Sequence, residues 1–378
     1  MAKVVDWDLG NRLLIYIEFD CSEEVKSEYM QRLGLKLWFE SKELVCVAGE
    51  GIYHHYIAKF DEFDGMYMGD IISISDQGYI SIMYSEHSGE IDVFMTNKCN
   101  SNCLMCPLPE IVRRKRQERH EEWVKEYIDI LPSYVRYINV TGGEPTISQQ
   151  FFFDMMKIMK EKFTEADFQL LTNGRSSADK NFLQKMLKVT PNGIRFAIPV
   201  HSANSNIHDM ITQVQGSFVQ TDRGIKNLLH KQQKVEIRIV VSKKNADTLV
   251  DTARYIVNNY QGVFCVNFIG MEMMGSAALN KDSLWIDYSE VFKKSKNAVD
   301  ILVEAAIDVQ LYNFPLCAVN RGYWHIAAKS ITDYKIRYMD ECEECSVKKI
   351  CGGFFYSTKQ IMKPRVTPVK CEDENKLL

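Results

Sequence analysis

From residue 91 onward, the chain alternates short apolar runs with longer stretches in which apolar residues recur at helical spacing. Repeated strand–helix units of this length predict a parallel sheet. Six such strands with their helices favour an α/β fold built as a partial (β/α)6 TIM-like barrel, with its chemistry at the carboxyl ends of the strands. The strands are expected at 91–96, 137–140, 168–171, 194–200, 235–241 and 264–270, and the helices at 121–131, 150–162, 178–188, 217–230 and 247–259.

Composition limits the class of protein. The chain has 378 residues, enough for two or three domains, and its 46 Lys and Arg residues nearly balance its 50 Asp and Glu residues. The resulting formal charge of −4 argues against a general binder of nucleic acid or of anionic membranes. The sequence contains neither a secretory signal in residues 1–10 nor an apolar run of about 18 residues, so we expect a cytoplasmic protein. In that reducing compartment, the 11 cysteines are expected to ligate metal or to do chemistry rather than form disulfides.

Three domains are expected. Residues 1–88 should form a small β-rich domain with one helix near Glu23–Leu33, and residues 89–307 should form the barrel, ending in an amphipathic helix at 288–306. The tail, residues 308–378, is rich in Cys and Gly with little periodicity, which is typical of a fold organised by a metal. The strands of the first domain are expected at 13–19, 35–39, 44–49, 52–60, 70–75 and 78–85.

The first cysteine group follows the first barrel strand. Cys99, Cys103 and Cys106 have the spacing C-x3-C-x2-C, which lets three thiolates converge on one centre from a single loop. Thiolate ligands select zinc or an iron–sulfur cluster. A structural zinc site requires four ligands, and no fourth Cys or His follows at ligand spacing. Three cysteines around a four-iron cluster would leave one iron open, as a catalytic cluster requires.

A glycine-rich turn follows the second strand. Gly142-Gly143-Glu144-Pro145 at this place, together with the three-cysteine loop, resembles the radical S-adenosylmethionine (SAM) superfamily. The resemblance implies that the three cysteines hold a 4Fe-4S cluster whose open iron is chelated by SAM. It also implies reductive cleavage of SAM to methionine and a 5'-deoxyadenosyl radical that abstracts hydrogen from the substrate. Gly142, Gly143 and Glu144 would bind the methionine amino end, with the glycines allowing close approach of the backbone to the ligand.

Polar residues follow the next strands as well. Thr172 and Asn173 follow the third strand, His201 and Ser202 the fourth, and Asn245 the fifth. Each is equally explained as a turn or cap residue. Asn173 and Ser202 are retained as candidate SAM contacts.

The segment after the fourth strand carries a further resemblance. His208-Asp209 followed by Gly216-Ser217-Phe218 resembles a stretch of peptide-modifying radical SAM enzymes. Those enzymes often carry Arg three residues after the Asp, where this chain has Thr212. Recognition of the SAM carboxylate by an Arg at that position is therefore in doubt.

The tail carries the second cysteine group. Cys342, Cys345 and Cys351 have the spacing C-x2-C-x5-C, which resembles the core of the SPASM extension that carries auxiliary clusters in radical SAM enzymes. A full SPASM domain continues with Cys where this chain has Phe355, and its opening element is absent. The resemblance therefore implies one auxiliary 4Fe-4S cluster rather than two. Cys371 is the expected fourth ligand, with Cys317 as the alternative, and a zinc knuckle remains open because C-x2-C is also a zinc signature.

The whole layout resembles one subgroup. Phe314-Pro-Leu-Cys, residues 329–335 and Cys351-Gly-Gly-Phe-Phe, together with the cluster loop, are similar to the C-type radical SAM maturase of the His-Xaa-Ser peptide system. The resemblance implies a ribosomally made precursor peptide as substrate and a second radical SAM protein as partner. A flavodoxin- or ferredoxin-type reductant is also expected.

Other interpretations stay open. A radical SAM enzyme acting on a small molecule or on RNA would share the barrel and the clusters, and a non-catalytic iron–sulfur or zinc protein would bind metal without cleaving SAM. The basic run Arg113–His120 is either the solvated start of a helix or a docking patch for an acidic leader peptide or reductant. The sequence identifies no catalytic acid or base.

Overall fold

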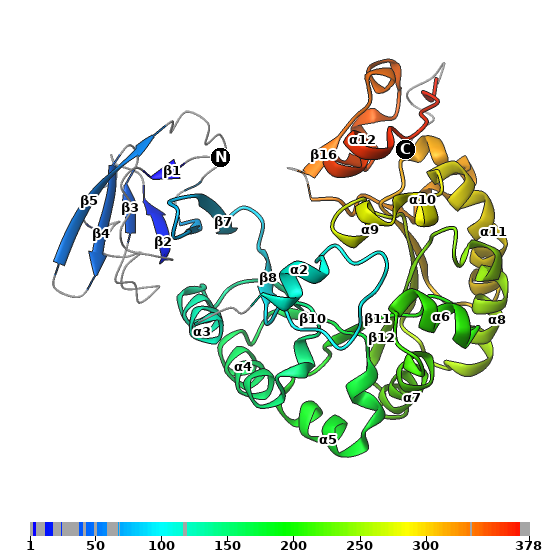
Figure 1. Cartoon of the computed structure of the whole chain (residues 1–378), viewed down its shortest axis with the longest axis horizontal. Helices are drawn as coiled ribbons and strands as arrows, with labels where there is room; N and C mark the ends of the chain where they lie inside the picture. The colour runs from blue at the N-terminus through cyan, green and yellow to red at the C-terminus, as the bar shows by residue number, and fades with distance from the viewer. Residues whose placement is uncertain are drawn as a thin grey trace.

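The computed structural model describes residues 67, 69–115, 119–332 and 335–370, together with Glu24 and the backbone of five strands between residues 3 and 58. In this part of the chain, eight strands form one sheet in the order β15-β14-β13-β12-β11-β10-β9-β8 (Figure 1). Every neighbouring pair is parallel, which confirms the predicted α/β fold with a partial barrel. The strands are β8 (Glu90–Phe94), β9 (Tyr137–Thr141), β10 (Asp167–Leu171), β11 (Arg195–Pro199), β12 (Lys234–Val240), β13 (Cys265–Ile269), β14 (Val309–Tyr312) and β15 (Ala327–Ala328).

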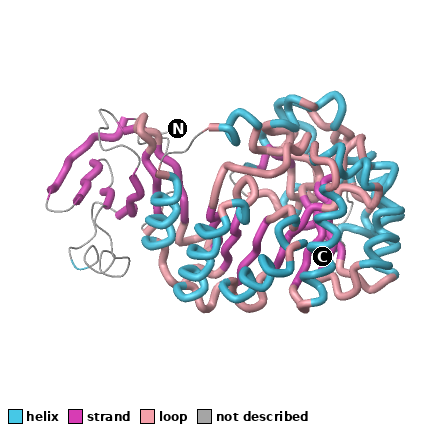
Figure 2. Tube along the Cα trace, turned by 60° about the horizontal axis from the view of Figure 1, so that its bottom comes forward, coloured by secondary structure: helices cyan, strands magenta, loops and turns pink. Residues whose placement is uncertain are grey.

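Helices surround the outer face of this sheet (Figures 1 and 2). Alternate residues of each strand face them, as in β9, where Ile138 and Val140 are fully buried and Asn139 between them points to the other face. The core of the molecule therefore lies between the sheet and its helices. These helices are α3 (His120–Ile130), α4 (Gln149–Lys162), α5 (Lys180–Val189), α7 (Ser217–His230), α8 (Leu249–Asn259) and α11 (Tyr288–Glu304).

Polar side chains line the inner face of the sheet. Glu236 of β12 is fully buried, and its carboxylate accepts hydrogen bonds from Gln169 Nε2 and Asn267 Nδ2, both at 2.8 Å. Arg238 Nε lies 2.6 Å from the same carboxylate, and Arg195 Nη1 lies 3.4 Å from it. One buried carboxylate thus faces two guanidinium groups, so this network carries a net positive charge.

The structure adds elements that the sequence pattern does not predict. A short helix, α6 (Ser205–Thr212), precedes α7, and β14 and β15 extend the sheet beyond the six expected strands and beyond residue 307. Strands of four and two residues are too short to show an alternating pattern. The domain limits at 88/89 and 307/308 remain predictions.

A second sheet, antiparallel except for one pair, precedes the barrel. Its described strands have the order β1-β5-β4-β3-β2-β6-β7, and β2 pairs in parallel with β3. Tyr127 of α3 donates a hydrogen bond to Met83 O of β7 at 2.8 Å, which ties this sheet to the barrel. Glu24 is helical, and the rest of the helix expected near 23–33 lies outside the described residues. The strands are β1 (Lys3–Val4), β2 (Arg12–Ile17), β3 (Trp38–Glu40), β4 (Glu43–Ala48), β5 (Gly51–Ala58), β6 (Ile71–Ile74) and β7 (Ile80–Tyr84).

Apart from β15, the described chain after β14 is built from short helical turns, a two-stranded antiparallel sheet of β16 (Ile336–Arg337) and β17 (Phe354–Phe355), and the helix α12 (Tyr356–Met362). It packs on the barrel through aromatic rings, because Tyr288 of α11 contacts Phe314 and Phe354 with ring centroids 6.1 and 5.8 Å apart. None of the helices in the described residues has the length and apolar character needed to cross a membrane.

Candidate functional site

The loop that carries Cys99, Cys103 and Cys106 follows β8 and is anchored by two other segments. Leu104 N donates to Ile211 O at 2.9 Å, at the end of α6. Ser276 N, after β13, donates to Cys106 O at 2.8 Å. The unpredicted helix α6 therefore supports the predicted cysteine loop.

Burial sets the chemistry of these thiols. Desolvation raises the pKa of Cys99, and it raises the pKa of Cys103 to about 12, with further contributions from the neighbouring cysteines. The positive charge of Arg113 acts in the opposite direction on both thiols. Metal ligation requires thiolates, so a cationic centre at this loop would have to displace the protons.

The chemistry of the three thiols suits an iron–sulfur cluster, whose irons each take one thiolate. In the described part of the chain, no three His, Cys, Asp or Glu side chains lie close enough together to share one metal ion. Zinc with Zn–S distances of about 2.3 Å would need its ligands almost in mutual contact. The cysteines of a four-iron cluster bind different irons and stand further apart. Cys99, Cys103 and Cys106 are the residues that would hold such a cluster.

Gly142 and Gly143 let the turn after β9 lie directly on the chain that leads into Cys99. A Cβ atom on Gly143 would lie 2.2 Å from Lys98 O, and one on Gly142 would lie 2.5 Å from Thr96 O. The turn is fixed there by hydrogen bonds from Gly143 N to Thr96 O at 2.6 Å and from Glu144 N to Lys98 O at 2.8 Å. Backbone packing against the cysteine loop therefore requires both glycines, independently of any ligand.

The Glu144 side chain is 1% exposed and joins the ends of two strands. Its carboxylate accepts hydrogen bonds from Thr146 Oγ1 at 2.6 Å and, from the end of β10, from Thr172 Oγ1 and Asn173 N at 2.7 Å each. The chain's own donors thus occupy the carboxylate, and they hold the β9 and β10 ends in register beside the cysteine loop.

The two retained strand-end candidates have different environments. Asn173 Nδ2 donates to Asn100 Oδ1 at 2.6 Å, so Asn173 lies against the cysteine loop. Ser202 is fully buried, and its hydroxyl bonds with Thr248 Oγ1 at 3.0 Å and accepts from Asn204 N at 3.1 Å. These contacts give Ser202 a cap-like role in the loop before α6.

Asp209 pairs with residues 216–218, the two parts of the segment singled out in the sequence. The Asp209 carboxylate accepts from Gly216 N at 2.6 Å and from Ser217 Oγ and Phe218 N at 2.8 Å each, at the N-terminus of α7. Burial alone would raise the pKa of Asp209, but these hydrogen bonds and His208 lower it. Thr212 bonds to Ser217 Oγ through its hydroxyl at 2.7 Å.

Sequence reasoning missed two features near this site. Arg175 Nη1 donates to Asn100 O at 2.8 Å and to Ser101 Oγ at 3.2 Å, inside the cysteine loop. His201 and His208 form a buried pair with ring centroids 5.4 Å apart, and His201 Nδ1 is an unpaired buried atom among the described residues. The only sequence signal for Arg175 was its place directly after Thr172-Asn173-Gly174, where β10 ends.

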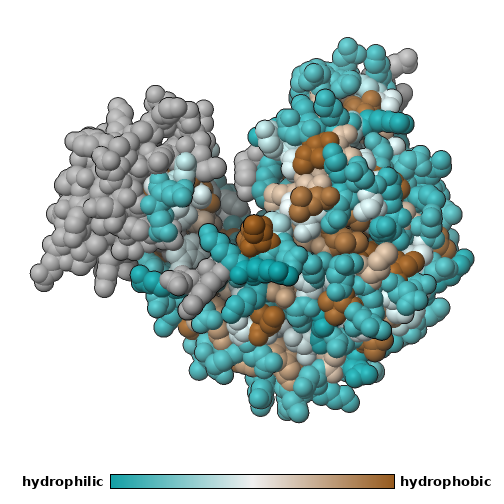
Figure 3. Space-filling view, viewed as in Figure 1, coloured by the Kyte–Doolittle hydropathy of each residue, from teal (hydrophilic) through white to brown (hydrophobic). Residues whose placement is uncertain are grey.

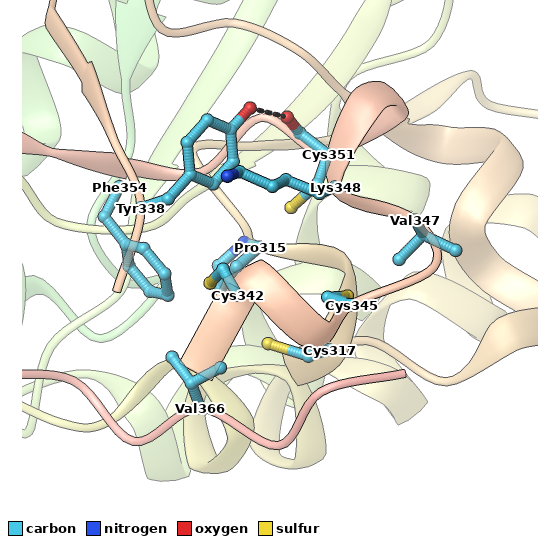
Figure 4. A pocket seen from close by; sticks show the side chains of 10 residues that line it. All are labelled: Pro315, Cys317, Tyr338, Cys342, Cys345, Val347, Lys348, Cys351, Phe354 and Val366. Carbon is cyan, nitrogen blue, oxygen red and sulfur yellow. Dashed lines mark hydrogen bonds between the residues drawn. The ribbon is translucent and has the colours of Figure 1, made fainter. Parts of the chain in front are cut away.

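A second cysteine cluster lies in the tail. Four cysteines line one pocket together with Tyr338, and Figure 4 shows their sulfur atoms around a common space. Tyr338 OH donates to Cys351 O at 2.9 Å. Cys371 lies outside the described residues. The four cysteines are Cys317, Cys342, Cys345 and Cys351.

Burial and backbone N–H groups act in opposite directions on the pKa values of the cysteines in this second pocket. Desolvation raises the pKa of Cys342 and Cys351, and it raises the pKa of Cys317 to about 11. Leu316 N and Gly353 N point at Cys351 Sγ, at 3.3 and 3.4 Å. N–H groups directed at sulfur stabilise a thiolate, and around an iron–sulfur cluster they raise the reduction potential.

The first strand of this parallel partial barrel ends in a three-cysteine loop, and a glycine turn packs on that loop. These features are those of a class of barrel proteins that bind a thiolate-ligated cluster. Residues 93–256 match the family model of the radical SAM superfamily, in agreement with the resemblance seen in the sequence.

Two curated relatives and one solved structure illustrate the similarity. The chain is 26% identical over 215 residues to GTP 3',8-cyclase of Petrotoga mobilis, covering 55% of this chain and 64% of the cyclase. It is 25% identical over 175 residues to the antilisterial bacteriocin subtilosin biosynthesis protein AlbA of Bacillus subtilis, covering 46% of this chain and 38% of AlbA. The crystal structure of Streptococcus suis SuiB bound to S-adenosylmethionine aligns with a TM-score of 0.46 and 13% identity, covering 61% of this chain and 51% of SuiB. The chain thus spans less than two thirds of each of these proteins.

Proposed function

We propose that the protein is a radical SAM enzyme that modifies a ribosomally made precursor peptide. A four-iron cluster held by Cys99, Cys103 and Cys106 would supply the electron that cleaves bound SAM to methionine and the 5'-deoxyadenosyl radical, which abstracts hydrogen from the substrate. The observation that carries the proposal is the cysteine loop at the carboxyl end of β8, packed on the glycine turn after β9. Gly142, Gly143, Glu144 and Asn173 would position the methionine end of SAM from the two neighbouring strands.

A peptide substrate is supported by the tail and by one relative. AlbA is named for bacteriocin biosynthesis, and the C-terminal motifs of this chain resemble those of the His-Xaa-Ser maturase. The predicted substrate is therefore a precursor peptide with His-Xaa-Ser repeats, and the predicted partner is a second radical SAM protein. Such an enzyme would work in the reducing cytoplasm, where free cysteines are available as ligands.

We propose that the tail holds one auxiliary 4Fe-4S cluster, with Cys317 as its fourth ligand. Cys317 lines the same pocket as Cys342, Cys345 and Cys351, which supports it as the fourth ligand, and Cys371, outside the described residues, stays the alternative. The buried pocket and the two N–H groups at Cys351 provide the setting in which a thiolate-bound cluster is stable.

The segment after the third cluster cysteine is the proposed docking site of an acidic electron carrier of the flavodoxin or ferredoxin type. α2 (Glu110–Arg114) is basic at its end, and Arg114 and Lys115 are exposed. Ile111 is 80% exposed, and Figure 3 shows a hydrophobic patch near α2 with hydrophilic side chains beside it. The exposed cationic side chains beside an exposed apolar one suit a negatively charged partner, and Arg114 also pairs with Glu110 at the start of α2.

The decisive experiment is anaerobic reconstitution with iron and sulfide, followed by iron counting and chromatography of 5'-deoxyadenosine after dithionite and SAM are added. About eight irons per chain and formation of 5'-deoxyadenosine are expected for two four-iron clusters. Cys99→Ala should abolish SAM cleavage. Cys345→Ala should retain slow cleavage of SAM but form no modified substrate. Zinc in place of iron, or iron without SAM cleavage, would leave a non-catalytic metal-binding protein.

A small anionic molecule is the second candidate substrate. The charge inside the barrel favours it, because Arg195 and Arg238 face the single carboxylate of Glu236. One of the relatives is named GTP 3',8-cyclase. Parallel incubations with a His-Xaa-Ser precursor peptide, GTP and RNA would separate the candidates, because the true substrate should accelerate SAM cleavage and gain or lose mass.

A further inference from the structure

The stretch between the first two cluster cysteines is held by side chains of the loop that follows β10. We propose that Arg175 is a positioning residue that holds this stretch and thereby fixes Cys99 relative to Cys103. The proposal rests on the proposed function only in taking these two cysteines as cluster ligands.

The contacts of Arg175 bridge the cysteine loop and α7. Its Nη1 donates to Asn100 O at 2.8 Å and to Ser101 Oγ at 3.2 Å, and its Nε donates to Gln220 Oε1 at 2.7 Å. Asn173 reinforces the bridge, since its Nδ2 donates to Asn100 Oδ1 at 2.6 Å and its Oδ1 accepts from Arg175 N at 3.0 Å. Both residues between Cys99 and Asn102 are therefore bound to the same loop.

The loop backbone next to Arg175 packs directly against α7. A Cβ atom on Gly224 of α7 would lie 2.1 Å from Gly174 O, so the helix is in direct backbone contact with this loop. Thr221 Oγ1, one turn earlier on α7, donates to Asn173 O at 3.0 Å. Because the backbone that carries Arg175 is held by α7, the guanidinium can keep Asn100 and Ser101 in place.

The second half of the cysteine loop depends on different bonds. Leu104 N and Ser276 N make backbone hydrogen bonds there, to Ile211 O and Cys106 O. Substituting Arg175 leaves these bonds intact. Loss of Arg175 should therefore loosen the loop at Cys99 and leave it unchanged at Cys106. A general loss of stability would affect both cysteines alike.

Arginine is required at this position for its shape and its charge. A planar guanidinium with five N–H donors can reach Gln220 on one edge and the cysteine loop on another, whereas a Lys ammonium cannot span both. A permanent positive charge beside an iron–sulfur cluster also favours the reduced state. Arg175→Lys should keep the charge but lose the bridge, and Arg175→Gln should lose both.

The first test uses the iron-free full-length chain and needs no cluster. N-ethylmaleimide labelling, read for each cysteine by peptide mass spectrometry, should modify Cys99 about tenfold faster in Arg175→Gln than in the wild type, with Cys106 unchanged. Arg223→Gln, an exposed substitution on α7, is the matched control and should change neither rate. Unchanged labelling of Cys99, or equal acceleration at Cys106, would overturn the positioning role.

The second test uses the reconstituted chain. The midpoint potential of the cluster, followed by electron paramagnetic resonance, should fall in Arg175→Gln and stay near the wild-type value in Arg175→Lys, while both variants lose iron to a chelator faster than the wild type. Wild-type potential and iron release in Arg175→Gln would contradict the inference. A wild-type chain that takes up no iron would contradict the proposed function instead, and the labelling rates would still decide the role of Arg175.

Discussion

His201 and His208 are two imidazoles held in the interior in their neutral form. Burial lowers the pKa of His201 to about 3 and that of His208 to about 4, and their mutual repulsion adds to the effect on His201. Asp209 opposes the shift of His208, and Arg175 adds to it. In the unfolded chain both imidazoles titrate near 6.5.

This pair predicts that the free energy of unfolding falls as the pH drops from about 6.5 toward 4. In that range the unfolded chain binds more protons than the folded chain, so stability rises with pH by about 1.4 kcal/mol per pH unit for each imidazole. Anaerobic urea denaturation between pH 5.5 and 7.5 should show the slope, and His208→Gln should reduce it. His230→Gln, at an exposed position, should leave the slope unchanged. The same slope in all three proteins would refute the assignment.

The residues predictable from sequence are those whose chemistry is set by local spacing. Cys99, Cys103 and Cys106 lie within one loop, so their spacing alone suggests a shared ligand. Arg175 reaches its partner Asn100 across 75 positions, and no local pattern reports such a contact. That Glu144 binds the methionine amino end of SAM stays a prediction, whereas the hydrogen bonds of its carboxylate to Thr172 and Asn173 became visible only in the structure.

At the scale of elements, the contact between the turn after β9 and the cysteine loop leaves the least room for a side chain. Gly143→Ala would place a methyl group 2.2 Å from Lys98 O, so the two backbones must separate. We expect this variant to lose more than tenfold in SAM cleavage and to retain less iron after reconstitution. Gly322→Ala is the control, because a Cβ atom there meets no atom within 4 Å. Full cleavage activity in Gly143→Ala would show that the turn can move without disturbing the cluster.

Elements were predictable where the apolar pattern was long enough. The helix expected at 217–230 has the observed limits of α7, because Phe218, Ile225 and Leu228 share one buried face. α6 spans only eight residues, and it begins through the Asn204 side chain, which accepts from Asn206 N and Ile207 N. A short helix fixed by a cap and by contacts with a distant loop gives little periodic signal.

At the scale of the whole molecule, the tail packs on the barrel through aromatic rings, and its cysteine pocket is lined by residues between 315 and 366. Cys317 precedes the other three pocket cysteines by at least 25 positions, so its role depends on how the tail folds back. We expect Cys317→Ser to lose about four irons per chain, the content of one four-iron cluster, and Cys371→Ser to lose none. Iron analysis with electron paramagnetic resonance would check both variants. Loss of the cluster only in Cys371→Ser would identify Cys371 as the fourth ligand.

At the same scale, electron delivery to the barrel is proposed to depend on the exposed basic end of α2. Attraction between the basic end of α2 and an acidic carrier is screened by salt, so the rate of carrier-driven SAM cleavage should fall as ionic strength rises. Arg114→Glu should reduce that rate at least fivefold at low salt, while dithionite-driven cleavage stays unchanged because a small reductant needs no docking surface. Lys185→Glu makes the same charge change on α5, which lies apart from α2 in Figure 1, and should preserve both rates. Equal carrier-driven rates in Arg114→Glu and the wild type would place the docking surface elsewhere, whereas equal losses with carrier and dithionite would mean that α2 supports the cluster itself.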